Sequence, residues 1–267
     1  MRKYGYLVVE GPHDVEFAYR LLSPYGMKRI QCKNEVDAFF HSLIPVRFPL
    51  EDGDIQKRVP IPLFLQSETH AIAIRSAMGD SQLVNVMVSS TALLTDLNEY
   101  VGVGILLDSD RQNPVDRYAA IKRELLEKSQ QFKLHDELGQ VNRGQPNLGA
   151  FVLPDNATLG TLEDLLLKCA EVVYPNLLEI AQNYVDAAKN TNLNREELKE
   201  IEKPAGRNKA IVGAMATIMK PGKSVQASIQ DNGWLKGEAL SLSRIKSVQE
   251  FLQILFELPV ESTQQLN

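Results

Sequence analysis

The sequence predicts an α/β fold built on a mostly parallel β-sheet with flanking helices, followed by a helical C-terminal region. Two patterns in the first 170 residues predict the sheet: short apolar runs of strand length, and helical periodicity in the segments between them. Alternating strands and helices are typical of βαβ units and therefore of parallel pairing. A third pattern, the loss of strand signals after about residue 171, predicts the helical region.

The first half of the α/β part contains one clear strand and helix and one irregular stretch. Residues 4–9 are β-branched and aromatic and lead into Glu-Gly-Pro, which predicts a strand and a turn, and residues 15–22 have helical spacing. Residues 45–70 carry four prolines and an acidic turn at 51–54, which predicts an insertion or irregular hairpin. A strand at 71–74 and a helix at 83–97 follow.

The second half contains the longest predicted strand. Residues 101–107 are continuously apolar, as in strands that helices cover on both faces. Asn113-Pro114 is a helix-start signal, and a charged amphipathic helix is expected over 115–128. The last strand is expected at 150–153, followed by a helix that opens at 160–164. Helical patterns then occupy 176–189, 196–202, 209–219 and 243–258.

The 267 residues suit one large domain or two modest ones, and we expect an α/β domain over 1–170 and a helical region over 171–267. An apolar content of 44% and a charged content of 24% exclude collagen-like, disordered and disulfide-scaffold classes. Two cysteines, Cys32 and Cys169, supply no disulfide framework and no zinc motif. The apolar runs are too short for a secretory leader or a membrane span, so we expect a cytoplasmic protein without a membrane partner.

Acidic side chains follow three predicted strands. Glu10 ends the first strand, Asp108 and Asp110 end the long central run, and Glu163 with Asp164 follows the last strand after a short loop. Ligands of an open parallel sheet bind outside the carboxyl ends of its strands, so these carboxylates are expected to meet there. Since carboxylates in close proximity repel each other, we expect a hard divalent cation such as Mg²⁺ to bind between them and offset their charge.

Two of these positions lie in motifs of a known family. Residues 9–17 (VEGPHDVEF) resemble the opening of a TOPRIM domain, the metal-binding module of topoisomerases and primases, and residues 105–110 (ILLDSD) resemble its second motif, in the same order. Glu10 to Asp14 fits the Glu-Gly-x-x-Asp of the nuclease branch typified by the overcoming-lysogenization-defect (OLD) family. Residues 151–155 and 162–164 resemble stand-alone bacterial TOPRIM-like proteins. The resemblance covers about residues 1–170, with an insertion between the two motifs.

The resemblance implies a Rossmann-like TOPRIM sheet and a phosphodiester-cleaving enzyme that acts on DNA or RNA. It implies that Glu10, Asp108 and Asp110 are catalytic. Metal ligands for Mg²⁺ or Mn²⁺ are implied at Glu10, Asp14, Asp108, Asp110 and Glu163. Two such ions could stabilise both the attacking and the leaving oxygen of an in-line displacement.

Structural explanations compete with each of these assignments. Asp108 and Asp110 could be turn formers or helix N-caps, since Asp favours both positions. Asp14 and Glu163 lie in first helical turns, where the helix dipole alone favours acidic residues. The TOPRIM motif does not require His13, which we expect to be a solvent-facing helix residue.

A local basic segment is the candidate nucleic-acid surface, because the formal net charge of −5 argues against binding through bulk charge. Residues 203–223 contain no Asp or Glu, and their five cations are Lys203, Arg207, Lys209, Lys220 and Lys223. We expect this segment to lie on the same side as the acidic cluster. A solvated helix with basic ends fits the same pattern.

The leading hypothesis is therefore a metal-dependent nuclease or related phosphodiester-transfer enzyme. The alternative is a non-catalytic TOPRIM-like module that binds nucleic acid or a partner ATPase. The ATPase would be a separate protein, because the only candidate phosphate-binding loop, Gly222-Lys223-Ser224, lacks the preceding strand and the first glycine of that motif. A phosphatase of the haloacid-dehalogenase type is disfavoured, since its D-x-D motif normally follows the first strand. An oligomer is compatible with the sequence.

Overall fold

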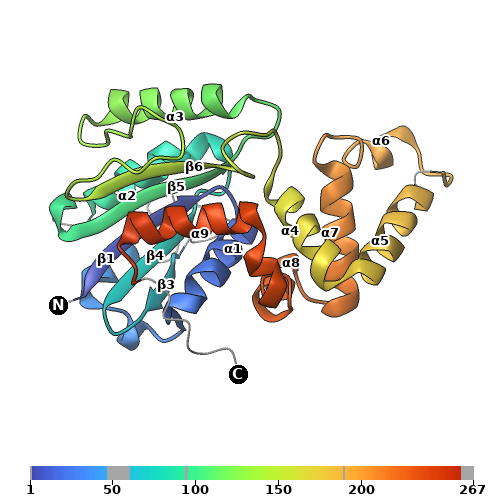
Figure 1. The fold of residues 1–267 in the computed structure, drawn as a ribbon, viewed down its shortest axis with the longest axis horizontal. Coiled ribbons are helices and arrows are strands. Elements are labelled where there is room, and N and C mark those ends of the chain that lie inside the picture. Colours follow the sequence, from blue (N-terminus) through green and yellow to red (C-terminus); the bar gives the residue numbers. More distant parts are fainter. Residues whose placement is uncertain (1, 47–60, 94–95, 189, 260–267) are drawn as a thin grey trace.

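The computed structural model describes residues 2–46, 61–93, 96–188 and 190–259, and six strands form one mixed sheet in the described part (Figure 1). The spatial order is β2-β3-β4-β1-β5-β6. Strands β4, β1, β5 and β6 are parallel, whereas β3 is antiparallel to both β4 and β2. The strands are β1 (Lys3–Val9), β2 (Lys28–Ile30), β3 (Leu63–Gln66), β4 (His70–Ser76), β5 (Tyr100–Asp108) and β6 (Asn147–Leu153). The predicted mostly parallel sheet is confirmed.

The helices lie at the predicted positions, although α2 and α6 are shorter than the predicted 83–97 and 196–202, and α8 is an addition. They are α1 (Pro12–Leu22), α2 (Leu83–Ala92), α3 (Pro114–Lys128), α4 (Leu162–Val173), α5 (Pro175–Ala188), α6 (Arg195–Leu198), α7 (Gly206–Met219), α8 (Val225–Asp231) and α9 (Ser243–Phe256). Among the described residues, no helix has the length and apolar character needed to cross a bilayer.

The sheet is the middle of three layers. Alternate residues of β1 enter opposite cores, because successive side chains of a strand point to opposite faces. Leu7 and Val9 pack in the core with α1, α4 and α9, whereas Tyr6 and Val8 pack in the core with α2 and α3. Figure 1 shows α2 and α3 on one face and α1 and α9 on the other. Burial on both faces explains the continuous apolar run of β5.

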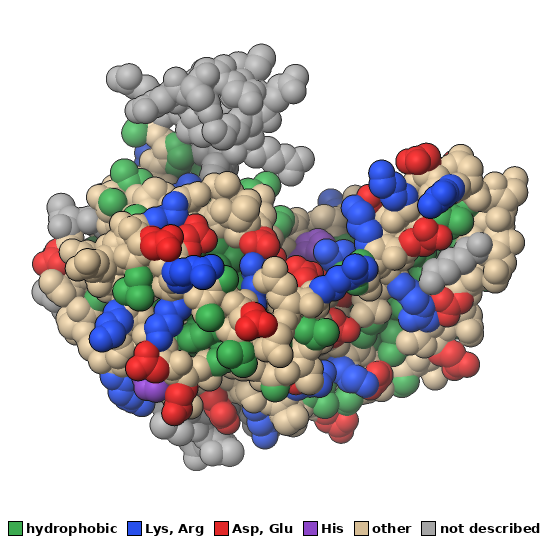
Figure 2. All heavy atoms as spheres, turned by 90° about the horizontal axis from the view of Figure 1, so that it is seen from above, with side chains coloured by type: hydrophobic (Ala, Val, Ile, Leu, Met, Phe, Trp, Pro, Cys, Tyr) green, Lys and Arg blue, Asp and Glu red, His purple; other side chains and the backbone are tan. Residues whose placement is uncertain are grey.

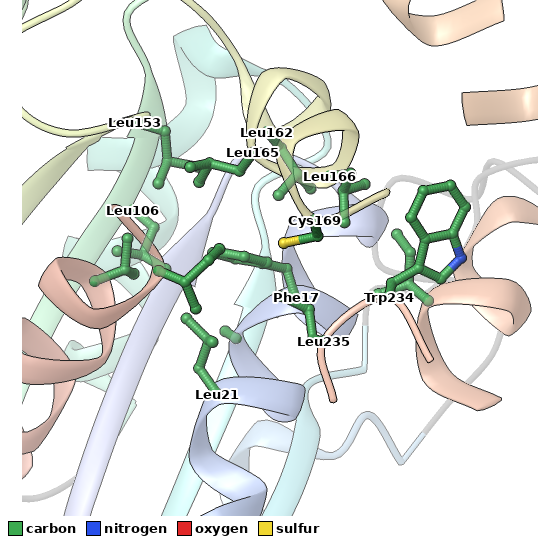
Figure 3. Packing of buried hydrophobic residues seen from close by; sticks show 14 of the residues in the cluster. Phe17, Leu21, Leu106, Leu153, Leu162, Leu165, Leu166, Cys169, Trp234 and Leu235 are labelled. Carbon is green, nitrogen blue, oxygen red and sulfur yellow. The ribbon is translucent and has the colours of Figure 1, made fainter. Parts of the chain in front are cut away.

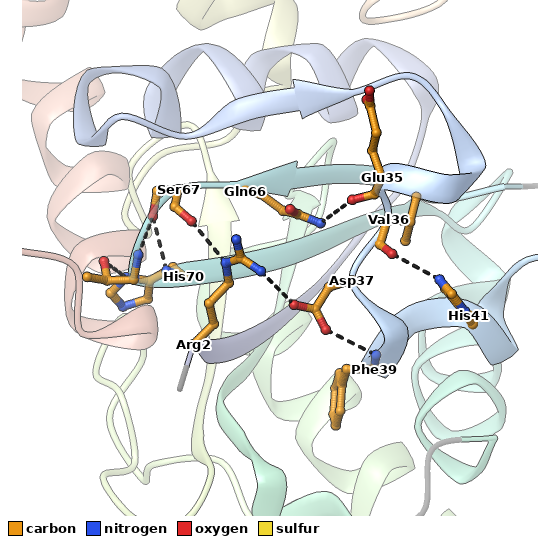
Figure 4. Close-up of polar contacts among 10 residues, drawn as sticks. Arg2, Glu35, Val36, Asp37, Phe39, His41, Gln66, Ser67 and His70 are labelled. Carbon is orange, nitrogen blue, oxygen red and sulfur yellow. Dashed lines mark hydrogen bonds and ion pairs between the residues drawn. The ribbon is translucent and has the colours of Figure 1, made fainter.

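The stretch around residues 45–70, expected to be an insertion or an irregular hairpin, contributes one strand of a hairpin to the sheet. Its described part includes β3, which forms an antiparallel hairpin with β4, and residues 47–60, with the acidic turn, lie outside the described residues. The short strand is anchored by polar contacts (Figure 4): Arg2 donates Nε to the Ser67 carbonyl at 3.1 Å and Nη1 to Asp37 Oδ2 at 3.0 Å. Four residues that directly follow Pro60 and Pro62 give a weak sequence signal, which is why β3 escaped prediction.

Helix α9 packs directly on the sheet and is not part of a separate appendage. The strands leave room for it with glycines: a Cβ on Gly102 would lie 2.0 Å from the Leu255 carbonyl oxygen, and one on Gly149 would lie 2.7 Å from the Phe251 ring. Contacts of α9 reach β1, β5 and β6. The expectation of a helical region after residue 170 is therefore right in secondary structure, but the last helix shares the core of the α/β part.

The remaining C-terminal helices join the α/β part through α4, which contacts α5 and α7, and through α1, which contacts α8. Figure 3 shows Leu162, Leu165 and Leu166 of α4 packed among residues of α1 and the sheet. Trp234, which follows α8, lies beside them. Cys169 lies in the same core, and burial raises the pKa of its thiol to about 12. Cys169 is therefore a packing residue.

The strand order changes direction at β1, and this change positions the site. From β1 the chain passes through α1 to the β2–β3–β4 side, and α2 then carries it across β1 to β5 on the other side. In open α/β sheets ligands bind at such a switch point, outside the carboxyl ends of the strands. The residues that follow β1 and end β5 lie at this switch point.

Candidate active site

A pocket of about 340 Å³ opens where β1 and β5 end and α1 and α4 begin. Four carboxylates line it: Glu10, Asp14, Asp108 and Glu163. Glu10 follows β1, Asp108 ends β5, and the other two lie in the first turns of α1 and α4. The fold therefore brings together four of the five predicted metal ligands.

Glu10 connects the two central strands. Its Oε1 accepts the backbone N–H of Asp108 at 2.9 Å and a hydrogen bond from Arg117 Nη2 at 3.2 Å. Arg117 also donates Nε to the Asp108 carbonyl at 3.2 Å. The two donors to Oε1 hold the Glu10 carboxylate in place between β1 and β5. Neither contact engages Oε2.

Asp14 and Asp108 each hold the start of a helix. Asp14 Oδ2 accepts the N–H of Gly11, the N-cap of α1, at 2.8 Å, and Asp108 Oδ1 accepts the N–H of Leu162, the first residue of α4, at 2.9 Å. Helix N-termini favour such negative charge. These contacts agree with the alternative interpretation as caps, and they engage one oxygen of each carboxylate.

Glu163 is paired with a histidine at the pocket wall. Its Oε2 accepts the Thr161 hydroxyl at 2.9 Å, and its Oε1 lies 3.9 Å from His13 Nδ1. The His13 side chain is 39% exposed, as expected of a solvent-facing helix residue, but it also lines the pocket. Asp164 is instead used in structure, because its carboxylate accepts the Thr161 N–H and the Asn208 amide. The choice of Glu163 over Asp164 agrees with this geometry.

Burial makes the charged forms of these carboxylates unfavourable. It raises the pKa of Glu10 to about 7, the pKa of Asp14 to about 6 and the pKa of Asp108 well above its ordinary value, and neighbouring carboxylates add to each effect. Burial acts in the same direction on Glu163, but hydrogen bonding by His13, the charge of Lys209 and the Thr161 hydroxyl together hold its pKa below the ordinary value. The pocket therefore has an excess of negative charge that a cation would offset.

Asp110 stands apart from the other predicted ligands. It is exposed, takes a left-handed conformation with φ of 50°, and donates its N–H to the Gly160 carbonyl at 2.9 Å. It does not line the pocket. Its charge still contributes to the raised pKa of Asp108. The structure thus places the first Asp of the D-x-D motif in the pocket and the second in the adjoining turn.

The predicted basic segment does not form one surface. Lys209 lines the pocket, but Lys203 pairs with Glu200, Arg207 with Asp186, and Lys220 with Asp231. The 14 residues of α7 span about 21 Å, so Lys220 and Lys223, beyond its C-terminus, lie far from the pocket end. Figure 2 shows Lys and Arg side chains interspersed with acidic ones over the part of the molecule formed by α5, α6 and α7, at the right of the view. The expected placement beside the acidic cluster holds only for Lys209.

Sequence reasoning missed Arg117 and the rim of the pocket. Arg117 reads as part of a charged helix face, and no sequence signal shows that it is buried. Met78 and Gly79 line the pocket from the loop after β4, with φ of 59° and 135°. The dipeptide Gly79-Asp80 is a recognisable turn signal, but it does not reveal which strand ends lie beside it.

The carboxylates do not form a ready-made metal cage. Within the described ranges, no group of three or more His, Cys, Asp or Glu side chains could hold a metal ion by itself. Backbone donors already occupy one oxygen each of Glu10, Asp14 and Asp108. Any metal here would need water or substrate oxygens as additional ligands.

Comparison with known proteins places the chain in a family. The model of the family described as "Protein of unknown function (DUF3226)" matches residues 4–257. The chain belongs to the DUF3226 family. The crystal structure of hypothetical protein PH0156 from Pyrococcus horikoshii OT3 is similar, with a TM-score of 0.55 and 16% identity over 96% of this chain and 95% of that one. This likeness shows the fold alone. No curated protein matches the chain.

Proposed function

We propose that this DUF3226 protein is a divalent-metal-dependent phosphodiesterase that cleaves DNA or RNA in the pocket between β1, β5, α1 and α4. The observation that carries the proposal is the convergence of Glu10, Asp14, Asp108 and Glu163 on one pocket in which burial raises the pKa of three of them. Perturbed carboxylates in a pocket at strand ends are typical of functional sites. The resemblance of residues 9–17 and 105–110 to TOPRIM motifs supports the same reaction and a TOPRIM-like assignment of the α/β part.

The donor set fits Mg²⁺ or Mn²⁺. All four carboxylates offer oxygen, the ligand that hard cations prefer. A backbone hydrogen bond fixes one oxygen each of Glu10, Asp14 and Asp108 and leaves the other for a ligand, whereas Glu163 has Thr161 on one oxygen and His13 beside the other. Mg²⁺ usually binds through one or two carboxylates together with waters and substrate phosphates, so it does not need a three-residue cage. One or two of Asp108, Asp14 and Glu163, together with water and phosphate oxygens, would hold the ion, which would offset charge on the phosphoryl oxygens.

Glu10 has the properties of a proton acceptor. A general base works best with a pKa near the working pH, and burial raises the pKa of Glu10 to about 7. Its Oε1 is held by Asp108 and Arg117, so the second oxygen can take the proton of an attacking water. Lys209 contributes the cationic wall of the pocket and would contact the phosphate of the substrate.

The test is cleavage of supercoiled plasmid and of structured RNA in Mg²⁺, Mn²⁺ or EDTA. The wild-type protein should cleave at least one substrate only with metal, and Asp108→Asn should not. Asp136→Asn is the matched control, because the Asp136 side chain is 90% exposed and pairs only with Lys122 in the described structure.

Failure of the wild type to cleave under all conditions would refute the proposal. Metal-independent cleavage, or equal activity of Asp108→Asn, would refute it as well. Nucleic-acid binding without cleavage would favour a non-catalytic module, which could act with a separate ATPase.

A further inference from the structure

Arg117 is a buried arginine in a place that helix electrostatics do not explain. Its side chain is 9% exposed and lies in the N-terminal part of α3, where the helix dipole favours acidic residues and disfavours cations. The helix already has a complete start: Pro114 occupies the first position, and Asn113 Oδ1 accepts the Val115 N–H at 2.9 Å. The reason for a cation at residue 117 must lie outside α3.

The guanidinium of Arg117 reaches the ends of three adjacent strands. Its Nε donates to the Asp108 carbonyl at the end of β5, and its Nη2 donates to Glu10 Oε1 after β1, both at 3.2 Å. The same Nη2 lies 3.0 Å from Asp80 Oδ1, in the loop after β4. A planar fork of several donors can make these contacts together, whereas the single ammonium of a lysine cannot.

The Asp80 contact connects Arg117 to the rim of the pocket. Met78 and Gly79, which line the pocket, directly precede Asp80, and the Gly79 N–H donates to the Glu10 carbonyl at 3.1 Å. Arg117 therefore holds the Glu10 carboxylate from one side while it ties down the loop that passes over the end of β1. Arg117 itself does not line the pocket.

We propose that Arg117 is the positioning residue of this site: it holds Glu10 by Oε1 and thereby orients the second carboxylate oxygen toward the attacking water. This inference rests on the proposed phosphodiesterase function. Burial alone would lower the pKa of Arg117, but the carboxylates of Asp80 and Glu10 outweigh it and raise the pKa, so the guanidinium stays charged. Because it acts through Glu10, Arg117 is not expected to contact the substrate.

The first arm of the test is steady-state cleavage with Mg²⁺ by Arg117→Lys. This variant keeps the charge but loses the fork, so kcat should fall roughly 10- to 100-fold while KM stays within about twofold, the range expected for a misplaced catalytic group. Arg123→Lys is the matched control, since Arg123 is exposed on the same helix, and its kcat should be unchanged. Asp80 contacts the same guanidinium but does not line the pocket. Asp80→Asn should therefore lower kcat less than threefold.

The second arm needs neither metal nor substrate. In EDTA at pH 8, Arg117→Met should raise the unfolding equilibrium constant more than about tenfold in the wild-type background. In a Glu10→Gln background the same change should raise it less than about threefold, because the charged partner is gone. A double-mutant cycle of this kind isolates the coupling between two contacting residues.

The outcomes separate the two proposals. Unchanged kcat in Arg117→Lys, or an equal loss in Asp80→Asn, overturns the positioning role. Equal destabilisation by Arg117→Met in both backgrounds overturns the coupling to Glu10. Absence of cleavage by the wild type overturns the proposed function and the catalytic purpose of Arg117, while the EDTA cycle still decides whether Arg117 and Glu10 are coupled.

Discussion

Replacement of Glu10 by Gln should stabilise the metal-free protein at alkaline pH. Gln keeps the shape of the side chain and an oxygen that can accept the hydrogen bonds from Asp108 and Arg117. It removes a carboxylate that burial makes difficult to ionise. A candidate active-site change that increases stability is the signature of a site under electrostatic strain, which a purely structural cap would not show.

The size of the effect follows from the pKa of Glu10. Burial, aided by the charge of Asp14, raises this pKa from 4.5 to about 7, although the Asp108 N–H and Arg117 act in the opposite direction. A carboxyl with a raised folded-state pKa loses stability as the pH rises from its unfolded pKa to its folded pKa, here from 4.5 to about 7. At about 1.4 kcal/mol per pKa unit, ionised Glu10 costs the fold about 3 kcal/mol at pH 8.

Thermal denaturation in EDTA at pH 8 and pH 5 is the assay. Glu10→Gln should be more stable than wild type by about 1 to 3 kcal/mol at pH 8, a rise in Tm on the order of 5 °C, and by less than about 1 kcal/mol at pH 5. Millimolar Mg²⁺ should raise the Tm of the wild type at pH 8 by mass action. A lower Tm for Glu10→Gln at pH 8, or the same difference at both pH values, would refute the reasoning.

Three further predictions follow from individual contacts. Asp108→Asn should abolish metal-dependent cleavage yet keep the circular dichroism spectrum, because its Oδ1 can still accept the Leu162 N–H; loss of folding would assign Asp108 a cap role only. Lys209→Glu should weaken nucleic-acid binding and flatten its salt dependence, whereas Lys223→Glu, at the far end of α7, should change neither; equal effects would contradict the local assignment. Gly213→Ala should stabilise the protein by about 0.5 to 1 kcal/mol in urea denaturation, since a Cβ there meets nothing within 4 Å and Gly is a poor helix former; a decrease would show hidden crowding in α7.

The sequence alone determined the elements whose signal is local. The apolar runs of β1, β5 and β6 read as strands because burial on both faces requires continuous apolar residues. The start of α3 was readable from Asn113-Pro114 and the opening of α4 from residues 160–164, whereas α1 begins at Pro12, ahead of the helical spacing predicted from residue 15. The convergence of Glu10 and Asp108 followed from one rule, that parallel strands present their carboxyl ends at the same edge.

Tertiary structure alone decided everything that depends on partners distant in sequence. The short strand β3 exists because it pairs with β4, and α9 lies on the sheet because glycines such as Gly102 leave room for its backbone. No periodicity in the sequence encodes either docking partner. Side-chain assignments changed for the same reason: ion pairs with other elements remove Arg207 and Lys220 from the pocket.

The clearest contrast is between Asp110 and Arg117. Asp110 belongs to a recognisable motif, but the turn after β5 places it outside the pocket walls, because backbone conformation decides where a side chain next to a ligand residue points. Arg117 belongs to no motif and contacts the ends of three strands. Its long side chain reaches back from α3 to Glu10 and Asp80, which are distant from it in sequence. Local sequence fixes which residues can form strands and caps, whereas burial and reach in three dimensions determine which of them act together.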